Sequence, residues 1–121
     1  MADATRSDFV WKNGELIKFE DATTHVLTHT LHYGSGVFEG IRCYYNEKTG
    51  KSNVFLLKEH MKRLVESCKI CSIPIEYTVE DLCEAALETI RANKFKACYI
   101  RPIVYYGYGQ LGVDPKGCPV E

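Results

Sequence analysis

The chain has 121 residues, a hydrophobic fraction of 45% and a charged fraction of 26%, as expected for one globular domain with its own core. Its formal net charge of −1 gives no electrostatic basis for binding nucleic acid or an anionic membrane. No apolar run approaches the roughly 18 residues of a membrane-spanning helix. The N-terminus lacks the apolar centre of a signal peptide, so a cytoplasmic location is expected.

The first half of the sequence predicts mainly β-strands. Residues 9–19 contain two strand-like runs around an Asn-Gly pair, which is typical of a type I′ hairpin turn. Strand-forming residues also fill 37–45 and 53–57. The polar run between them, 47–52, predicts a second hairpin.

Two helices and one more strand are predicted after these hairpins. Apolar residues recur at helical spacing over 58–71 and again over 79–93, where Thr78 and Asp81 have the spacing of a capping box. Residues 96–106 predict a strand that lies at a sheet edge or bends at Pro102, because proline has no N–H to donate. The order of elements indicates an α+β fold.

Two motifs that would indicate other functions are rejected on their context. Gly34, Gly36 and Gly40 do not form a dinucleotide fingerprint, because Glu39 takes the place of the third glycine and a strand, not a helix, follows. The histidines among residues 25–32 lack a matching carboxylate or cysteine. We expect them to be hydrogen-bonded around a turn, with no metal bound.

The six cysteines are expected to be reduced thiols, because no secretory signal accompanies them. Cys68 and Cys71 form a lone C-x-x-C inside a predicted helix, with no second pair to complete a zinc site. Packing on the helix face is therefore the expected role of this pair.

A small-molecule pocket is the function that the residues around Gly34 favour. Glycine lets the backbone approach a ligand closely, and the rings of Tyr33 and Phe38 provide apolar walls. A tight turn with core aromatics is the alternative. Arg101 suits a carboxylate or phosphate, but an edge-strand arginine reaching into solvent is equally compatible with the sequence, and Arg63 is by default a solvated helix residue.

Four motifs in the same order resemble the N-terminal part of branched-chain amino acid aminotransferases, which are fold-type IV pyridoxal-phosphate (PLP) enzymes. They are H-Y-G-S-G-V-F-E-G-I-R from His32, K-E-H-M-K-R-L from Lys58, A-C-Y-I-R-P from Ala97 and G-V-D-P from Gly112. The resemblance implies that residues 1–121 are a small domain with an antiparallel sheet and two helices. It also implies that PLP binds between this domain and a larger C-terminal one.

The resemblance also implies roles for single residues. Arg63 matches the arginine that binds the PLP phosphate, and Tyr33 and Phe38 match the wall of the branched side-chain pocket. Tyr99 and Arg101 match substrate contacts, with the arginine facing the distal carboxylate of glutamate. Val113 matches a loop that reaches the neighbouring subunit's active site, and Tyr33 also serves across the interface, so a homo-oligomer is expected.

No catalytic residue is expected in this chain. Transamination needs a lysine that forms a Schiff base with PLP and moves the substrate's proton. In the family this lysine lies in the C-terminal domain, and none of the ten lysines here stands in a matching motif. We therefore expect the N-terminal part of a transaminase that exchanges amino groups between Leu, Ile or Val and 2-oxoglutarate, with the fragment inactive alone.

Two alternatives remain open at this point. Aminodeoxychorismate lyase and D-amino acid aminotransferase share the fold type, although the Y-I-R-P and G-V-D-P motifs favour the branched-chain group. A non-enzymatic binding or dimerisation module is a different class of hypothesis. The expected partners are amino acid and 2-oxo acid substrates and the C-terminal domain of the same protein.

Overall fold

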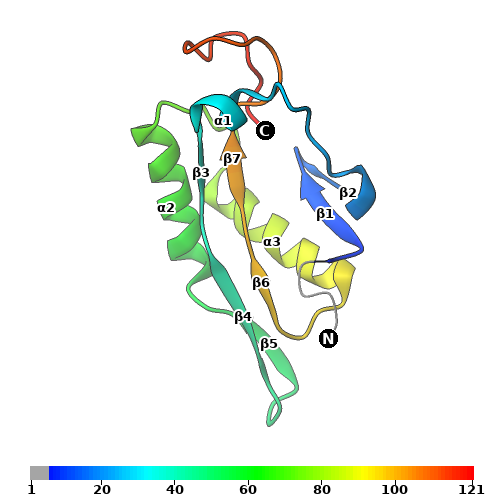
Figure 1. Cartoon of the computed structure of the whole chain (residues 1–121). Helices are drawn as coiled ribbons and strands as arrows, with labels where there is room; N and C mark the ends of the chain where they lie inside the picture. Colours follow the sequence, from blue (N-terminus) through cyan, green and yellow to red (C-terminus); the bar gives the residue numbers. More distant parts are fainter. Residues whose placement is uncertain (1–5) are drawn as a thin grey trace.

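The computed structural model of the chain describes residues 6–121 and has the expected α+β architecture (Figure 1). The elements in chain order are β1 (Phe9–Lys12), β2 (Glu15–Lys18), the 3-10 helix η1 (Phe19–Asp21), α1 (His29–Tyr33), β3 (Gly36–Phe38), β4 (Ile41–Asn46), β5 (Lys51–Val54), α2 (Leu57–Ile70), α3 (Val79–Asn93), β6 (Cys98–Ile100) and β7 (Ile103–Tyr105). All strand pairs are antiparallel, in the orders β1-β2, β3-β7 and β5-β4-β6.

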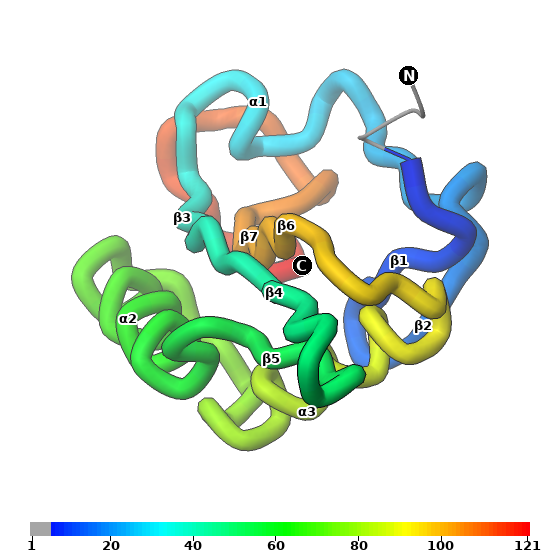
Figure 2. The backbone as a smooth tube through the Cα atoms, turned by 90° about the horizontal axis from the view of Figure 1, so that it is seen from below, coloured from blue at the N-terminus to red at the C-terminus, as the bar shows by residue number. Residues whose placement is uncertain are grey.

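The two long helices form one layer and the strands another. Seen from below, α2 and α3 lie together on one side of β4, β5 and β6, while the β1–β2 hairpin lies beyond β6 (Figure 2). The buried core between the layers comes from both helices, from the loop between them and from two strands. Its members are Ile41, Met61, Leu64, Cys68, Ile73, Leu82, Ala86 and Val104. Burying each large side chain among them stabilises the fold by about 1.5–3 kcal/mol.

Both predicted hairpins form. In the first, Asn13 and Gly14 have φ of 50° and 95°, as a type I′ turn requires of its two central residues. In the second, β4 pairs with β5, and Gly50 takes the left-handed φ of 67° that ends the loop. The strand predicted over 53–57 is misplaced: β5 begins at Lys51, inside the predicted loop, and ends at Val54, and Leu57 already begins α2.

The two helices match their predictions within one residue at each end. α3 begins with the expected capping box: Asp81 N–H donates to Thr78 Oγ1 at 3.1 Å, and Thr78 N–H donates to the Asp81 carboxylate at 2.9 Å. Cys68 is fully buried in the α2 face of the core, as expected, whereas Cys71 lies beyond the end of α2 and is exposed. The predicted packing role is therefore wrong for Cys71. Within residues 6–121, no helix has both the length and the apolar character needed to cross a membrane.

Two predicted strands are each interrupted once. The strand expected over 37–45 breaks after Phe38 into β3 and β4, and the one expected over 96–106 breaks after Ile100 into β6 and β7. The breaks face each other, because Glu39 N–H donates to the carbonyl of Pro102 at 3.1 Å. Proline cannot donate a ladder hydrogen bond, and the strand is interrupted at Arg101 and Pro102 while β6 forms an edge of its sheet, so the effect predicted for Pro102 is observed.

Candidate functional site

Three of the expected site residues gather at the facing strand breaks. Phe38 ends β3, Tyr99 lies in β6, and Arg101 follows β6 directly. All three side chains are exposed, on the face of the strands opposite to the core. The strand breaks therefore bring together an aromatic ring, a phenol and a guanidinium from segments about 60 residues apart in sequence.

The Arg101 side chain is held by its two aromatic neighbours. Its Nε and Nη2 donate hydrogen bonds to Tyr99 Oη at 3.2 and 2.6 Å. Its guanidinium carbon lies 4.3 Å from the Phe38 ring centroid, a cation–π arrangement. Tyr99 and Arg101 thus point to the same face, as alternation predicts. The edge of the guanidinium that contains Nη1 makes no hydrogen bond within residues 6–121.

Gly40 is required by the packing of Tyr99. A Cβ built on Gly40 would lie 2.5 Å from Tyr99 Oη and 3.3 Å from its Cζ, so the phenol lies directly across the glycine backbone. Gly36 is similarly enclosed, with Thr30 Oγ1 at 2.9 Å from its Cβ position, and Gly34 ends α1 at a φ of 63°. The sequence suggested that these glycines let the backbone approach a ligand. In the structure, Gly36 and Gly40 instead lie against side chains of the chain itself, and Gly34 serves the turn that ends α1.

Arg63 is paired with a buried carboxylate. Its Nε and Nη2 donate to the two oxygens of Glu39, each at 2.8 Å, in the bidentate side-on geometry of a strong ion pair. His60, one helical turn earlier on α2, lies with its Nδ1 2.8 Å from the same carboxylate. Arg63 is thus ion-paired and not the isolated residue that its helix position alone suggests, although its side chain remains 66% exposed.

Glu39 is charged in this setting. The hydrogen bond from Arg63, and to a smaller extent that from His60, lowers the pKa of the Glu39 carboxyl below its ordinary value, although burial alone would raise it. The side chain is only 5% exposed. It alternates inward with Ile41 and Cys43, while Phe38 and Gly40 face outward. The Glu39 partner Arg63 and the Phe38–Tyr99–Arg101 group thus lie on opposite faces of the segment 38–43.

Tyr33 belongs to a second group at the other end of β3. Its ring lies 4.6 Å from that of His29, which is 1% exposed. His29 Nε2 is 2.7 Å from the carbonyl oxygen of Gly112, and its Nδ1 is 2.6 Å from Ser35 Oγ. A carbonyl only accepts, so Nε2 carries the proton and donates to Gly112, which places the neighbouring Val113 beside α1.

The other two histidines of this segment are also hydrogen-bonded locally. His25 Nδ1 accepts from the N–H of Leu27 at 3.0 Å, and His32 Nε2 is 2.8 Å from the carbonyl of Val26. The prediction that these histidines are hydrogen-bonded around a turn is thereby confirmed. Val113 is 81% exposed and Tyr33 is 42% exposed, so both present surface at this end of the molecule.

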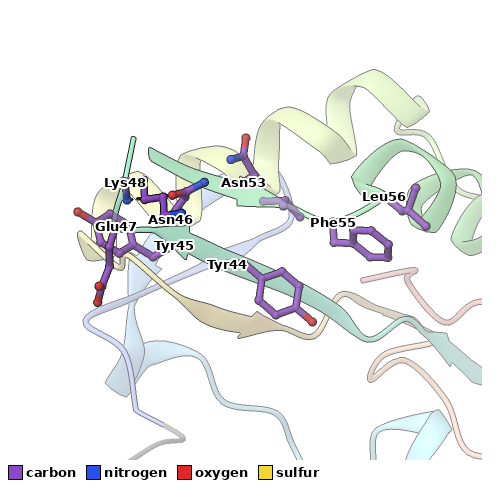
Figure 3. Close-up of a pocket in the computed structure, with 9 residues that line it drawn as sticks. Tyr44, Tyr45, Asn46, Glu47, Lys48, Asn53, Phe55 and Leu56 are labelled. Carbon is purple, nitrogen blue, oxygen red and sulfur yellow. Dashed lines mark hydrogen bonds between the residues drawn. The ribbon is translucent and has the colours of Figure 1, made fainter. Parts of the chain in front are cut away.

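The surface formed by residues 6–121 includes a hollow over the β4–β5 hairpin and another beside β6 and β7. In the first, the side chains of Tyr44 and Phe55 lie beside each other (Figure 3). The other runs between the β1–β2 hairpin and β6–β7 and includes Tyr99 and Arg101 in its lining. The linings of both hollows lack Tyr33, Phe38, Arg63 and Val113, so neither hollow encloses all six expected site residues.

Three residues that organise these groups were not singled out from the sequence. They are Glu39, His60 and His29, for which the sequence pattern predicts no site role. The spacing of His60 and Arg63, three residues apart on one helix face, is the signal that they could share a partner. The sequence contains no comparable signal for the contact between His29 and Gly112, which lie 83 residues apart.

Comparison with known proteins gives a consistent result along the chain. The family model described as amino-transferase class IV matches residues 36–120. The branched-chain-amino-acid aminotransferase of Salmonella typhimurium is 46% identical over 110 residues, which cover 91% of this chain and 35% of the relative. That of Pseudomonas aeruginosa is 42% identical over 121 residues, covering all of this chain and 39% of the relative.

Solved structures agree in fold. The Escherichia coli branched-chain amino acid aminotransferase matches with a TM-score of 0.89 at 43% identity, over 95% of this chain and 38% of that one. The branched-chain aminotransferase of the archaeon Thermoproteus uzoniensis, solved with norvaline, matches with a TM-score of 0.87 at 44% identity, over 95% and 38%. The enzyme of Thermobaculum terrenum, solved in its PLP-form, matches with a TM-score of 0.84 at 31% identity, over 94% and 38%. The chain spans little more than a third of the length of these relatives.

Proposed function

Because the chain belongs to the class IV aminotransferase family, we propose that residues 1–121 are the small N-terminal domain of a branched-chain amino acid aminotransferase. The proposed enzyme exchanges the amino group of leucine, isoleucine or valine with 2-oxoglutarate. Relatives that bear this enzyme name at 46% and 42% identity support the proposal. The Schiff-base lysine is assigned to a C-terminal domain, so the chain alone is expected to be inactive.

The observation that carries this proposal is the stacking of Arg101 on Phe38. The ring provides an apolar wall, suited to a branched aliphatic side chain. The guanidinium lies 4.3 Å from that ring and keeps its Nη1 edge without a hydrogen-bond partner in the described part of the chain, suited to the distal carboxylate of glutamate or 2-oxoglutarate. One place can therefore serve the two substrate types that this transamination alternates between.

The proposed cofactor is pyridoxal 5′-phosphate, and Arg63 is the residue of this chain assigned to its phosphate. A donor for phosphate must be charged, accessible and have N–H groups to spare. Arg63 is 66% exposed and donates only Nε and one hydrogen of Nη2 to Glu39, which leaves three N–H groups. The residues present therefore fit the phosphate, and bound pyridoxal phosphate supplies the electron sink that the chemistry needs.

A second copy of the protein is the proposed partner at the α1 end. Tyr33 and Val113 are exposed there and are tied to each other through His29 and the Gly112 carbonyl. Apolar side chains this exposed are common in surfaces that become buried on association. We assign this surface to the interface of a homodimer, in which each copy completes the other's substrate pocket.

The test of the proposed function is substrate discrimination by the complete enzyme. Arg101→Ala should lower kcat/KM for glutamate on the order of ten- to a hundredfold more than for leucine, because only glutamate has a distal carboxylate to lose its partner. Arg91→Ala is the matched control, since Arg91 is also exposed but pairs with Glu84 on α3. It should leave both substrates unchanged.

Equal losses for glutamate and leucine in Arg101→Ala would reject the assigned role and indicate damage to the fold of the site. Absence of leucine transamination in the wild-type enzyme, saturated with pyridoxal phosphate, would reject the branched-chain assignment itself.

A further inference from the structure

The contacts of Glu39 point to a role that its place in the sequence does not indicate. Removing a carboxylate from water costs free energy unless the carboxylate is paired and hydrogen-bonded, and the Glu39 side chain is only 5% exposed. Glu39 accepts three hydrogen bonds, two from Arg63 and one from His60. These residues lie three apart on one face of α2, so the carboxylate fixes two side chains of the same helix at once.

The geometry of the ion pair determines which part of Arg63 remains available. Nε and Nη2 form the side edge of the guanidinium, and both bind Glu39. The remaining edge, with both hydrogens of Nη1 and the second hydrogen of Nη2, is the one suited to a bidentate phosphate contact. An exposed arginine without this pairing would spread over many rotamers, and ordering it on binding would cost free energy.

The backbone of Glu39 is fixed as well. Its N–H donates to the Pro102 carbonyl at 3.1 Å, at the two facing strand breaks. Its neighbours in sequence are Phe38, which stacks on Arg101, and Gly40, which packs against Tyr99. The position of the Arg63 guanidinium is thus coupled to the segment that forms the proposed substrate wall.

We propose that Glu39 is a positioning residue, which holds the guanidinium of Arg63 side-on so that its free edge is set for the phosphate of the cofactor. The inference rests on the proposed assignment of Arg63 to that phosphate. It makes a prediction of definite sign. If only the Coulomb interaction mattered, removing the negative charge of Glu39 beside Arg63 would strengthen anion binding. If Glu39 positions the Arg63 guanidinium, the same change weakens anion binding.

The experiment measures pyridoxal phosphate affinity in the complete apoenzyme by absorbance titration, with pyridoxal, which has no phosphate, as the matched ligand. Glu39→Gln keeps the size of the side chain and removes its charge. We expect it to weaken pyridoxal phosphate binding about ten- to a hundredfold, by analogy with the range known for residues that orient metal ligands, and to leave pyridoxal unchanged. Unchanged or tighter pyridoxal phosphate binding would overturn the proposal.

A double-mutant cycle separates positioning from structural damage. In an Arg63→Ala background, positioning predicts that Glu39→Gln has no further effect, because there is no guanidinium left to orient. The same fold-loss in both backgrounds would contradict the role of Glu39. Full affinity in Arg63→Ala alone would instead reject the phosphate assignment of Arg63, and the inference with it.

A second variant covers the case in which Glu39→Gln does not fold. Arg63→Lys lies at an exposed helix position and keeps the charge, but an ammonium group cannot bind Glu39 side-on and a phosphate with a separate edge. Its affinity for pyridoxal phosphate should fall about tenfold or more, again without a change for pyridoxal. Wild-type affinity in Arg63→Lys would show that charge without orientation is sufficient and would overturn the proposal.

Discussion

Replacing His29 by alanine should release the loop that carries Val113 and destabilise the whole domain. The His29 ring is 1% exposed and makes two hydrogen bonds, to Ser35 Oγ and to the Gly112 carbonyl. Each buried hydrogen bond contributes about 1 kcal/mol net, and truncating a buried ring costs about 2 kcal/mol more when scaled down from phenylalanine. The sum, about 4 kcal/mol, is a large part of the roughly 5–15 kcal/mol by which domains are stable.

Urea denaturation of the 121-residue chain measures this loss, with the single tryptophan, Trp11, as the fluorescence probe. Trypsin cleavage after Lys116, inside the loop that follows Gly112, measures its release under native conditions. His32→Ala is the matched control. His32 is an exposed residue of the same short helix with one hydrogen bond, to the Val26 carbonyl, so its loss should cost less than about 0.5 kcal/mol.

The reasoning fails if His29→Ala costs less than about 1 kcal/mol, since two buried hydrogen bonds could not then be lost. It also fails if the variant is destabilised but cleavage after Lys116 stays at the rate of the control. In that case the contact between His29 and Gly112 would not be what holds the loop.

Three further predictions rest on single contacts or surfaces. Gly40→Ala should destabilise the chain by about 1–3 kcal/mol, because its Cβ would lie 2.5 Å from Tyr99 Oη. Adding Tyr99→Phe removes that oxygen and should restore most of the lost stability in thermal unfolding. A double variant no more stable than Gly40→Ala would contradict the contact. The ion pair with Arg63 lowers the pKa of the Glu39 carboxyl below 4.5, so its stabilisation is complete above about pH 4.5 and is lost as pH falls through the lowered pKa of the folded state. Glu39→Gln should therefore show a smaller acid-induced drop in urea midpoint than the wild-type chain. An equal drop in both would exclude Glu39 as the cause. Sedimentation equilibrium at micromolar concentration should show a dimer or higher oligomer that Val113→Asp weakens, and a 13.8 kDa monomer throughout would assign the dimer contacts to other parts of the enzyme.

Local patterns predicted the elements whose cause is itself local. The Asn13–Gly14 turn, the capping box at Thr78 and the amphipathic periods of α2 and α3 all depend on residues within a few positions of one another, and all are present in the structure. The pairing of Tyr99 with Arg101 also follows from alternation along one strand.

The strand breaks show where local patterns are insufficient. Within residues 37–45, Gly40 is only a weak local signal of an interruption after Phe38, and the residue facing that interruption lies in another segment. Pro102, about 60 residues later, cannot continue the ladder, and the facing strand separates at the same level. The sequence predicted an edge position or a bend at Pro102 and missed the matching interruption at Glu39.

The sequence by itself determined the fold class, the order of the elements and, through four motifs, the family resemblance, because these depend on residue type and on spacing along the chain. Only the tertiary structure decided which side chains meet. It gave Arg63 a buried partner, placed Phe38 under Arg101 and joined His29 to Gly112. The physical reason is that a charge or hydrogen-bond donor acquires its role from the groups that surround it in space, and burial determines which of those contacts are strong.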